Sequence, residues 1–432
     1  MVDRLLDDAT LVEEAQIDGD VAVAPYDLQV GPGTARSALR SRDFRVLWIS
    51  TFASNVGTWM QNVALGAFAY QLSHSAGFVA LTGFAQLGPL LALAAVGGVL
   101  ADAVDRRRIL VATNLVQLLF SGVLAAVAAA SHPSRTLLLL VVLAIGVANA
   151  LTGPPLSSLL PNLVPRRDLP GAIALQSVQM NLSRVVGPAI GGLLLPTIHA
   201  SGVFGLNAAT YLFAVAGALA IRPVAGGRSG ERGLRRLLGG FAVARRDPLV
   251  RSVLVTIASI SFFCLPFIGL MPVIAAQNLG MKVTGFEYGL LYASFGLGAA
   301  CGAIVVGSFL VGYPRDRVIA AGLALFGLTL LVFGVLRTPA PSYPIVFLVG
   351  LFYFATVTTL STRLQEHLRD EVRGRVMALY MMGFGGTIPL GLLVAGPIAT
   401  RTNITTVVVA GAIVAMLLAA RAARPAFPKH VD

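Results

Sequence analysis

Long apolar stretches separated by short polar turns run along most of the chain. Each stretch is long enough for a helix to cross the hydrocarbon core of a bilayer, which takes about 20 residues. They lie at approximately 46–72, 77–101, 108–131, 136–160, 171–196, 201–222, 250–276, 285–312, 316–337, 343–363, 373–400 and 404–421. The pattern predicts an all-α membrane protein with twelve transmembrane helices. We expect prolines inside the stretches to kink helices rather than end them, because lipid offers no partner to free backbone groups. These are Pro89, Pro188, Pro266, Pro272 and Pro389.

Basic residues gather in every second loop between the stretches. The basic residues in the loops on the other side of the predicted membrane are only Arg135, Lys282, Arg337 and Arg401. Because basic residues in short loops stay in the cytoplasm, we expect both termini on the cytoplasmic side of a bacterial inner membrane. The formal net charge of +12 is spread over these loops rather than over one face of a domain, so it predicts no nucleic-acid partner.

The longest polar connection divides the twelve stretches six and six. Within it, apolar residues recur at helical spacing from Leu234 to Phe241, which predicts a short amphipathic helix on the inner membrane surface. The N-terminal residues are acidic with few large apolar side chains, and such a composition is typical of disorder. The predicted units are a disordered cytoplasmic tail at 1–42, a six-helix bundle at 43–222, a cytoplasmic linker at 223–249, a second six-helix bundle at 250–422 and a cytoplasmic tail at 423–432.

The chain offers little chemistry for catalysis or metal binding. Cys264 and Cys301 lie inside apolar stretches, where a thiol behaves as a small hydrophobic group. We therefore expect no disulfide, no metal site and no cofactor. All five histidines lie in loops or at the ends of stretches, which argues against a membrane enzyme. The pattern favours a monomer that lies in the lipid bilayer and binds a small molecule.

A charged turn between the second and third stretches carries the most specific motif. It reads Gly98-Val-Leu-Ala-Asp102-Ala-Val-Asp105-Arg-Arg-Arg108. The two halves of the chain also look alike, since 163–172 and 368–378 are both charged turns that lead into a stretch with a Gly-Pro step. Parallel repeats of this kind occur in one transporter architecture in particular. From about residue 44 to residue 424, the chain resembles the major facilitator superfamily.

This resemblance implies a gating role for the charged turn. The residues that match the family's motif are Gly98, Asp102, Asp105, Arg106, Arg107 and Arg108, with Asp105 standing where glycine is usual. Asp102 would lie against the positive start of the eleventh helix, near Arg373, and hold the outward-open state. The alternative interpretation of Asp102 is a solvated surface carboxylate.

Two further matches narrow the resemblance. Gly187-Pro188-x-x-Gly191-Gly192 resembles the end of the antiporter motif of proton-coupled exporters, although these glycines equally suit helix packing alone. The segments 43–48 and 54–61 resemble the branch of the enterobactin exporter and the transmembrane secretion effectors. The branch implies a secondary active transporter that exports a drug, siderophore or other amphiphilic metabolite in exchange for protons by alternating access. The alternatives are an importer or lysolipid flippase of the same fold, and a transport-inactive sensor or scaffold.

Polar residues inside the apolar stretches are the candidates for a substrate cavity. Arg184 lies near the middle of the fifth stretch, where an arginine costs at least about 2.5 kcal/mol on insertion scales. It either faces the cavity and contacts an anionic substrate, or bonds to backbone carbonyls near the Gly-Pro step. Glu287, at the outer start of the eighth stretch, either is the proton site or faces water. The other cavity candidates, each of which also suits helix packing, are Gln61, Asn62, Gln86, Asn149 and Gln179.

Overall fold

All regular elements that the structure describes are helices. The computed structural model describes residues 33–222, 233–310 and 312–423, without the side chains at 94–99, 101–103, 233–239, 370 and 371. The elements before the linker are α2 (Ala35–Ala38), α3 (Arg42–Ser73), α4 (Ala76–Ala103), α5 (Arg106–Ala129), α6 (Arg135–Leu163), the short turn η1 (Arg166–Asp168) and α7 (Leu169–Ala220). The later ones are α8 (Gly233–Arg246), α9 (Pro248–Ser259), η2 (Ile260–Cys264), α10 (Pro266–Gly269), α11 (Met271–Gln277), α12 (Phe286–Ser308), α13 (Arg315–Val335), α14 (Pro339–His367), α15 (Asp370–Met381), η3 (Met382–Gly386), α16 (Thr387–Arg401) and α17 (Ile404–Ala423).

Short polar side chains set the starts of several helices. The Oδ1 atom of Asp105 accepts a hydrogen bond from the backbone N–H of Arg107, in the first turn of α5, at 2.8 Å. Ser134 accepts one from the backbone at the start of α6, at 3.3 Å, and Asp247 accepts two at the start of α9, at 2.9 and 3.1 Å. Each side chain satisfies backbone N–H groups that the first helical turn leaves free, so the polar turns fix where the apolar helices begin.

Histidines and prolines break the helices at particular points. His74 (φ 49°) ends α3, and His199 (φ 58°) interrupts α7, so that α7 consists of two helical segments. Pro89 lies inside α4 without ending it, as expected. The same expectation was wrong for Pro266 and Pro272, which lie at the starts of α10 and α11. Proline has no backbone N–H to bond the preceding turn, and here the helix restarts after a π-helical segment, η2.

Ten segments of the described residues are long and apolar enough to cross a membrane. One of them, Arg166–Ala220, includes the break at His199, and α3 is not among the ten. The structure therefore agrees with an all-α membrane protein, while the number of twelve crossings stays a prediction.

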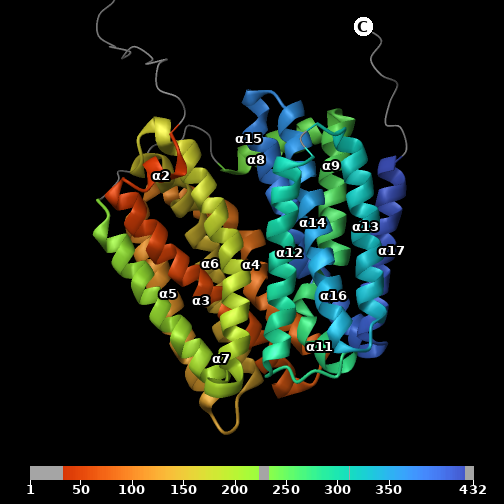
Figure 1. Ribbon diagram of the computed structural model, residues 1–432. Helices are drawn as coiled ribbons and strands as arrows, with labels where there is room; N and C mark the ends of the chain where they lie inside the picture. Colours follow the sequence, from red (N-terminus) through yellow and green to blue (C-terminus); the bar gives the residue numbers. More distant parts are fainter. Residues whose placement is uncertain (1–32, 223–232, 311, 424–432) are drawn as a thin grey trace, which may run out of the picture.

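The long helices form two groups (Figure 1). In the first group α7 packs along α3 and α5, and α6 packs against α4 and α5. In the second group α14 packs against α12 and α13, and α13 also packs along α17. The two most extensive contacts between the groups join α7 with α12 and α4 with α16. Any binding site between the groups is therefore bordered by these four helices and their neighbours.

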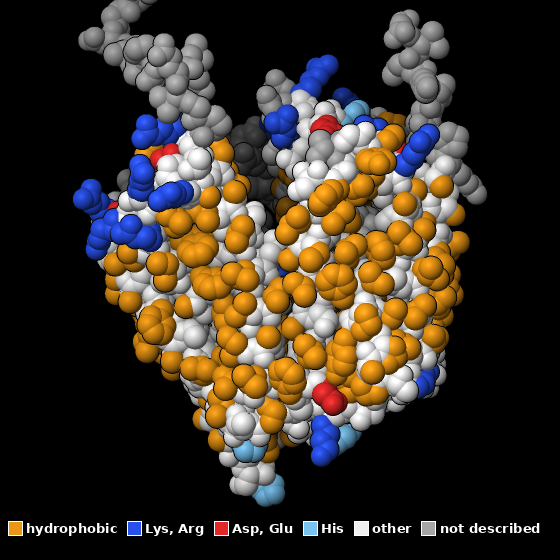
Figure 2. All heavy atoms as spheres, viewed as in Figure 1, with side chains coloured by type: hydrophobic (Ala, Val, Ile, Leu, Met, Phe, Trp, Pro, Cys, Tyr) orange, Lys and Arg blue, Asp and Glu red, His pale blue; other side chains and the backbone are white. Residues whose placement is uncertain are grey.

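The outer surface is mostly apolar, and its charges are concentrated at one end (Figure 2). Leu140, Phe213 and Leu417 are exposed by 59%, 61% and 65%, and large exposed apolar areas of this kind match lipid rather than water. Lys and Arg side chains gather at the end that carries α2, α8 and α15, which we call the basic end. In Figure 2 the surface is hollowed between the two groups at the basic end.

At the opposite end the two groups touch directly. The backbone N–H of Gly77 at the start of α4 donates to Thr400 Oγ1 on α16, at 2.9 Å. The hydroxyl of Tyr288 on α12 donates to the carbonyl of Val63 on α3, at 3.4 Å. The two groups are thus in direct contact at this end, whereas the surface between them is hollowed at the basic end (Figure 2).

The segments that the sequence assigned to a tail and a linker include ordered helices. Within the predicted tail, α2 lies against the start of α7, where Ser37 Oγ donates to Asp168 Oδ1 at 2.7 Å. Residues 1–32 lie outside the described residues. Within the predicted linker, α8 packs against α15, and an added Cβ at Gly240 would lie 2.8 Å from the carbonyl oxygen of Arg375.

Candidate substrate-binding site

Arg184 lies at mid-height between the two groups of helices. It is 15 residues from Leu169, where α7 begins, and 15 from the break at His199. Its guanidinium carbon is 5.7 Å from the ring centre of Trp59 on α3 and 5.1 Å from that of Phe354 on α14. Trp59 and Phe354 are themselves near the middle of their helices. A cation therefore lies between aromatic rings from both groups, near the middle of the membrane.

The guanidinium of Arg184 has no hydrogen-bond or ion-pair partner among the described residues. No backbone carbonyl accepts from it, in contrast to the alternative in which it bonds near the Gly-Pro step. Two ring faces attract the cation by about 0.5–2 kcal/mol each, but they leave its N–H donors free. On the same helices, the buried hydroxyls of Ser183 and Tyr353 also lack partners. The arrangement suits an anion that accepts several hydrogen bonds.

Three of the other cavity candidates connect helices within the first group. Gln61 is 1% exposed, and its Oε1 accepts from Ser121 Oγ at 3.0 Å and from Asn207 Nδ2 at 2.8 Å. Gln86 Nε2 donates to Asn62 Oδ1 at 2.5 Å, which links α4 to α3. The geometry of Gln61 is that of a packing amide, whereas Asn62 and Gln86 are only partly buried.

Gln179 and Asn149 lie in different surroundings. Gln179 is buried, its Nε2 donates to the carbonyl of Trp48 at 3.4 Å, and its Oε1 has no partner. Asn149 is exposed and borders a small polar cavity of about 60 Å³ inside the first group. The structure thus does not bring the predicted amides together around Arg184.

The glycines of the antiporter-like motif lie in tight helix contacts. An added Cβ at Gly187 would lie 2.7 Å from a backbone carbonyl oxygen of α3, and one at Gly191 would lie 3.1 Å from another. Gly192 faces α12 instead, where its Cβ would lie 3.1 Å from the backbone N of Gly289. Pro188 is buried in the same helix. Because backbones approach closely only where side chains are absent, Gly192 forms part of the contact between the two groups, whereas Gly187 and Gly191 pack within the first group.

The basic residues of the charged turn bind carbonyls of their own group. Arg106 Nη1 donates to a carbonyl of α6 at 2.8 Å, and Arg107 Nε donates to a carbonyl at the end of α7 at 2.9 Å. Asp105 caps α5, and Arg108 is exposed. These contacts hold the starts and ends of three helices together. The remaining motif positions, Gly98 and Asp102, lie outside the residues whose side chains are described.

A hydrogen-bonded pair of side chains joins α9 to α14 at the basic end. His367 Nε2 and Asp247 Oδ2 are 2.7 Å apart, and both side chains are partly exposed. Partial burial raises the pKa of Asp247, but the hydrogen bonds from His367 and from the start of α9 outweigh it and hold this pKa below its usual value. The second group is therefore tied together by a carboxylate that prefers to stay ionised.

The candidate proton site is not at the middle of the membrane. Glu287 lies in the first turn of α12, where its side chain is exposed. This is the end at which the two groups touch. The structure does not place Glu287 beside Arg184.

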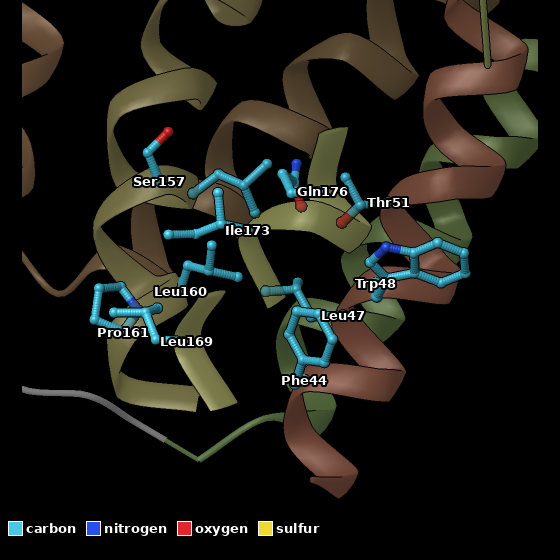
Figure 3. A pocket seen from close by; sticks show the side chains of 11 residues that line it. Phe44, Leu47, Trp48, Thr51, Ser157, Leu160, Pro161, Leu169, Ile173 and Gln176 are labelled. Atoms are coloured by element: carbon cyan, nitrogen blue, oxygen red, sulfur yellow. The ribbon is translucent and has the colours of Figure 1, made fainter. Parts of the chain in front are cut away.

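A larger pocket lies in the first group, between α6 and the pair α3 and α7 (Figure 3). Its volume is about 270 Å³. Most of its lining is apolar, and Thr51 and Gln176 lie together at one end of it in Figure 3. The lining residues are Phe44, Leu47, Trp48, Thr51, Leu156, Ser157, Leu160, Pro161, Leu169, Ile173 and Gln176.

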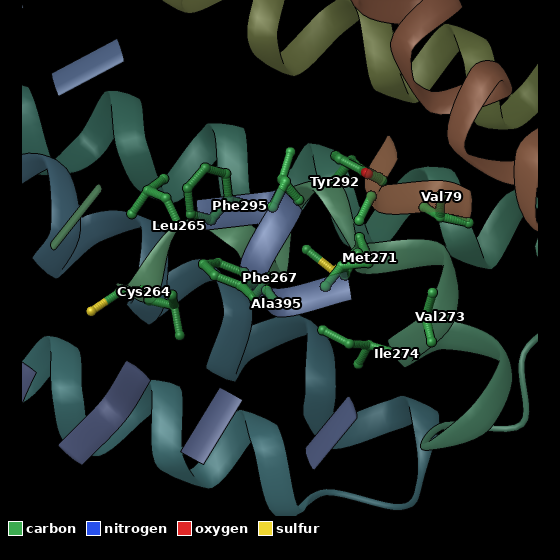
Figure 4. Packing of buried hydrophobic residues seen from close by; sticks show 14 of the residues in the cluster. Val79, Cys264, Leu265, Phe267, Met271, Val273, Ile274, Tyr292, Phe295 and Ala395 are labelled. Carbon is green, nitrogen blue, oxygen red and sulfur yellow. The ribbon is translucent and has the colours of Figure 1, made fainter. Parts of the chain in front are cut away.

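The interior of the second group is aromatic and aliphatic (Figure 4). Phe267 packs edge to face against Phe295 and Phe333, with ring centres 5.8 and 6.0 Å apart. All three are buried. The first group instead carries the buried amides described above, which bond within that group.

Sequence reasoning missed the aromatic partners of Arg184. Trp59 and Phe354 lie in apolar stretches, where nothing distinguishes a cavity-facing ring from a lipid-facing one. One signal was present: the chain has only two tryptophans, and both Trp48 and Trp59 lie on α3. Gly289, which meets the antiporter-like motif, carried no comparable signal.

The helical groups and the apolar surface are those of a helical membrane protein with two halves, and the mid-membrane cation is a candidate binding site between them. The family model for the transmembrane secretion effectors matches residues 33–430. The chain belongs to this family of the major facilitator superfamily, as the sequence motifs indicated.

Curated relatives cover most of the chain. A staphyloferrin A transporter of Staphylococcus aureus is 26% identical over 352 residues, which is 80% of this chain and 86% of the relative. The enterobactin exporter EntS of Shigella boydii is 30% identical over 349 residues, which is 78% of this chain and 80% of the relative. The protein is therefore a multi-pass transporter of the inner membrane, not an enzyme.

Solved structures support the fold. The nucleoside transporter NupG matches with a TM-score of 0.70 at 14% identity, covering 88% of this chain and 99% of its own. A bacterial homologue of the human lysosomal transporter Spinster, in an inward-facing conformation, matches with a TM-score of 0.70 at 15% identity, covering 89% and 96%. At this identity the likeness concerns the fold alone.

Proposed function

We propose that the protein exports an anionic, amphiphilic small molecule, such as a siderophore, from the cytoplasm by alternating access and in exchange for protons. The observation that carries the proposal is the guanidinium of Arg184, which lies between Trp59 and Phe354 without a polar partner. The names of two relatives supply the substrate class, since they refer to staphyloferrin A and enterobactin.

The proposal includes twelve crossings and cytoplasmic termini. The ten candidate spans become twelve if α3 crosses the membrane and α7 crosses it twice, on either side of His199. The concentration of Lys and Arg at the basic end supports a cytoplasmic orientation of that end. The bundles at 43–222 and 250–422 then correspond to the two groups of helices, joined by the linker at 223–249.

In this orientation the structure is the inward-open state. The contacts Gly77 to Thr400 and Gly192 to Gly289 lie on the closed, outer side. Export requires that they separate while the basic end closes around the site. The gating role of Asp102 rests on the sequence motif, and it would act at the basic end in the opposite, outward-open state.

Arg184 is suited to sense the substrate because it contacts both groups. An anionic group that reaches the guanidinium gains charge-assisted hydrogen bonds that the rings cannot supply. The anionic group and the guanidinium are buried between Trp59 and Phe354, where the local dielectric constant is low and these hydrogen bonds are therefore stronger. Glu287, which is exposed at the outer side, is the proposed site of proton exchange with that face.

The test measures binding and transport by purified protein in proteoliposomes, with dihydroxybenzoate as the anionic probe and its methyl ester as the neutral one. We expect Arg184→Gln to weaken binding of the acid about 10- to 100-fold, the value of one charged hydrogen bond, with little effect on the ester. Arg184→Lys should show an intermediate loss because it lacks bidentate geometry. Arg421→Gln, at an exposed arginine near the end of α17, is the matched control. An imposed pH gradient should speed transport if protons are exchanged.

Equal affinity of Arg184→Gln and the unaltered protein for the acid would contradict the proposal. Loss of folded protein in all Arg184 variants, with equal effects on acid and ester, would instead support a structural arginine. Uptake toward the basic end in oriented vesicles would point to the importer, and binding without transport would point to the sensor.

A further inference from the structure

The pocket between α6 and the pair α3 and α7 shares two helices with the Arg184 site. On α7, Ile173 lines the pocket and Arg184 follows eleven residues later. On α3, Trp48 lines the pocket and Trp59 follows eleven residues later. Eleven residues make about three turns of an α-helix. Each pair therefore lies on one face of its helix, and the two sites follow one another along α3 and α7.

The distance between the two sites follows from the helix rise. Thr51 and Gln176 mark the end of the pocket that is nearest to Arg184. Thr51 is eight residues from Trp59 on α3, and Gln176 is eight residues from Arg184 on α7. Eight residues correspond to about 12 Å along the helix axis. An extended chain of single bonds covers roughly 1.2 Å per bond, so about ten bonds connect the guanidinium to the pocket.

The size and lining of the pocket indicate what it holds. Its volume of about 270 Å³ lies just below the 300–1,000 Å³ or so that whole ligands occupy. It therefore takes one portion of a molecule rather than all of it. Leu47, Leu160 and Ile173 suit an apolar portion, and none of the described residues that line the pocket is charged.

We propose that the pocket is a second subsite, which holds the apolar end of an elongated acid while Arg184 holds its anionic group. The inference rests on the proposed function and adds a substrate class to it. The molecule carries an acid at one end and an apolar chain or ring about ten or more bonds away. Shorter acids reach Arg184 but leave the pocket empty, so binding strengthens only once the apolar end enters it.

The two tryptophans report on the two subsites separately. Trp48 lines the pocket and Trp59 lies over Arg184, and the chain has no other tryptophan. Trp59→Phe leaves a reporter in the pocket, and Trp48→Phe leaves one at the guanidinium. The probes are bromohexanoic and bromododecanoic acids with bromine on the terminal carbon, because bromine quenches the fluorescence of an indole that it touches. Protein in nanodiscs is titrated with each acid.

We expect bromododecanoate to quench Trp48 and bromohexanoate to quench Trp59 but not Trp48. Ile173→Phe, which fills the pocket, should abolish the quenching of Trp48 and lower the affinity for the long acid at least tenfold, while leaving that for the short acid unchanged. Leu193→Phe is the matched control, because Leu193 is also exposed on α7 and lies outside the pocket. In the Arg184→Gln variant both acids should lose specific quenching.

The outcomes separate this inference from the proposed function. If the long acid quenches Trp48 equally in the Ile173→Phe and Leu193→Phe variants, or never quenches it, the pocket is not a subsite, although Arg184 still binds acids. If neither acid quenches Trp59, both proposals are wrong. If a lysophospholipid with the same chain competes with the long acid while dodecanoate does not, the site recognises a lipid phosphate, and the assignment to acids of this class is overturned.

Discussion

The contact between Gly192 and Gly289 gives the sharpest test of how the two groups close on the outer side. A Cβ added at Gly289 would lie 2.8 Å from the backbone N of Gly192 and 3.0 Å from the carbonyl oxygen of Pro188. Ordinary contact begins near 3.4 Å, so Gly289→Ala must separate α7 from α12 by at least about 0.6 Å. Backbone atoms on both sides cannot move out of the way as a side chain would. Overpacking of this kind costs about 1–3 kcal/mol.

The same helix supplies a matched control. Gly307 also lies in α12, and an added Cβ there has no atom within 4 Å. Gly307→Ala should leave stability unchanged or raise it by up to about 1 kcal/mol through helix propensity. Both variants can be unfolded in mixed micelles by increasing the fraction of sodium dodecyl sulfate.

Spin labels across the outer contact measure the conformational effect. We expect Gly289→Ala to shift the population toward states in which the outer side is separated, because the added methyl group is tolerated only there. Transport should fall accordingly. If Gly289→Ala unfolds, transports and populates conformations just as Gly307→Ala does, then close backbone approach does not hold the outer side closed.

Two further predictions concern the basic end. The lowered pKa of Asp247 means that its contribution to stability is complete above the usual aspartate value of about 3.9 and is lost as the pH falls through the lowered value. Asp247→Asn should therefore reduce the fall in melting temperature below about pH 4. If the melting temperature of the variant depends on pH just as that of the unaltered protein does, the pair with His367 does not contribute to stability. In a background without native cysteines, Ser131→Cys should react with an impermeant maleimide on intact cells, whereas Tyr313→Cys should react only after permeabilisation; the reverse pattern would invert the topology.

The sequence predicted much of the architecture but not the contacts between helices. Long apolar stretches and basic turns depend only on local composition, so the helical membrane fold followed from them. The family was indicated by its resemblance to specific motifs, above all the charged turn at 98–108. Arg184 was found for the same reason, since a charge in an apolar stretch is visible without knowing its neighbours. Its environment was not, because Trp59 and Phe354 come from helices distant in sequence. In lipid, an apolar side chain suits an outward face as well as an inward one, and hydropathy does not distinguish them.

Packing decided the remaining features. The sequence left Gln61 open between a cavity and a helix contact, and only the positions of Ser121 and Asn207 show that its oxygen is already occupied. The prolines of the seventh stretch looked like kinks, yet the backbone restarts at Pro266 where η2 widens the turn. What the sequence by itself determined was that the chain is a helical membrane protein, because the transfer free energy of apolar stretches is summed along the chain. Which residues meet between the two groups was decided by tertiary structure, because it depends on how closely glycine-bearing helices approach.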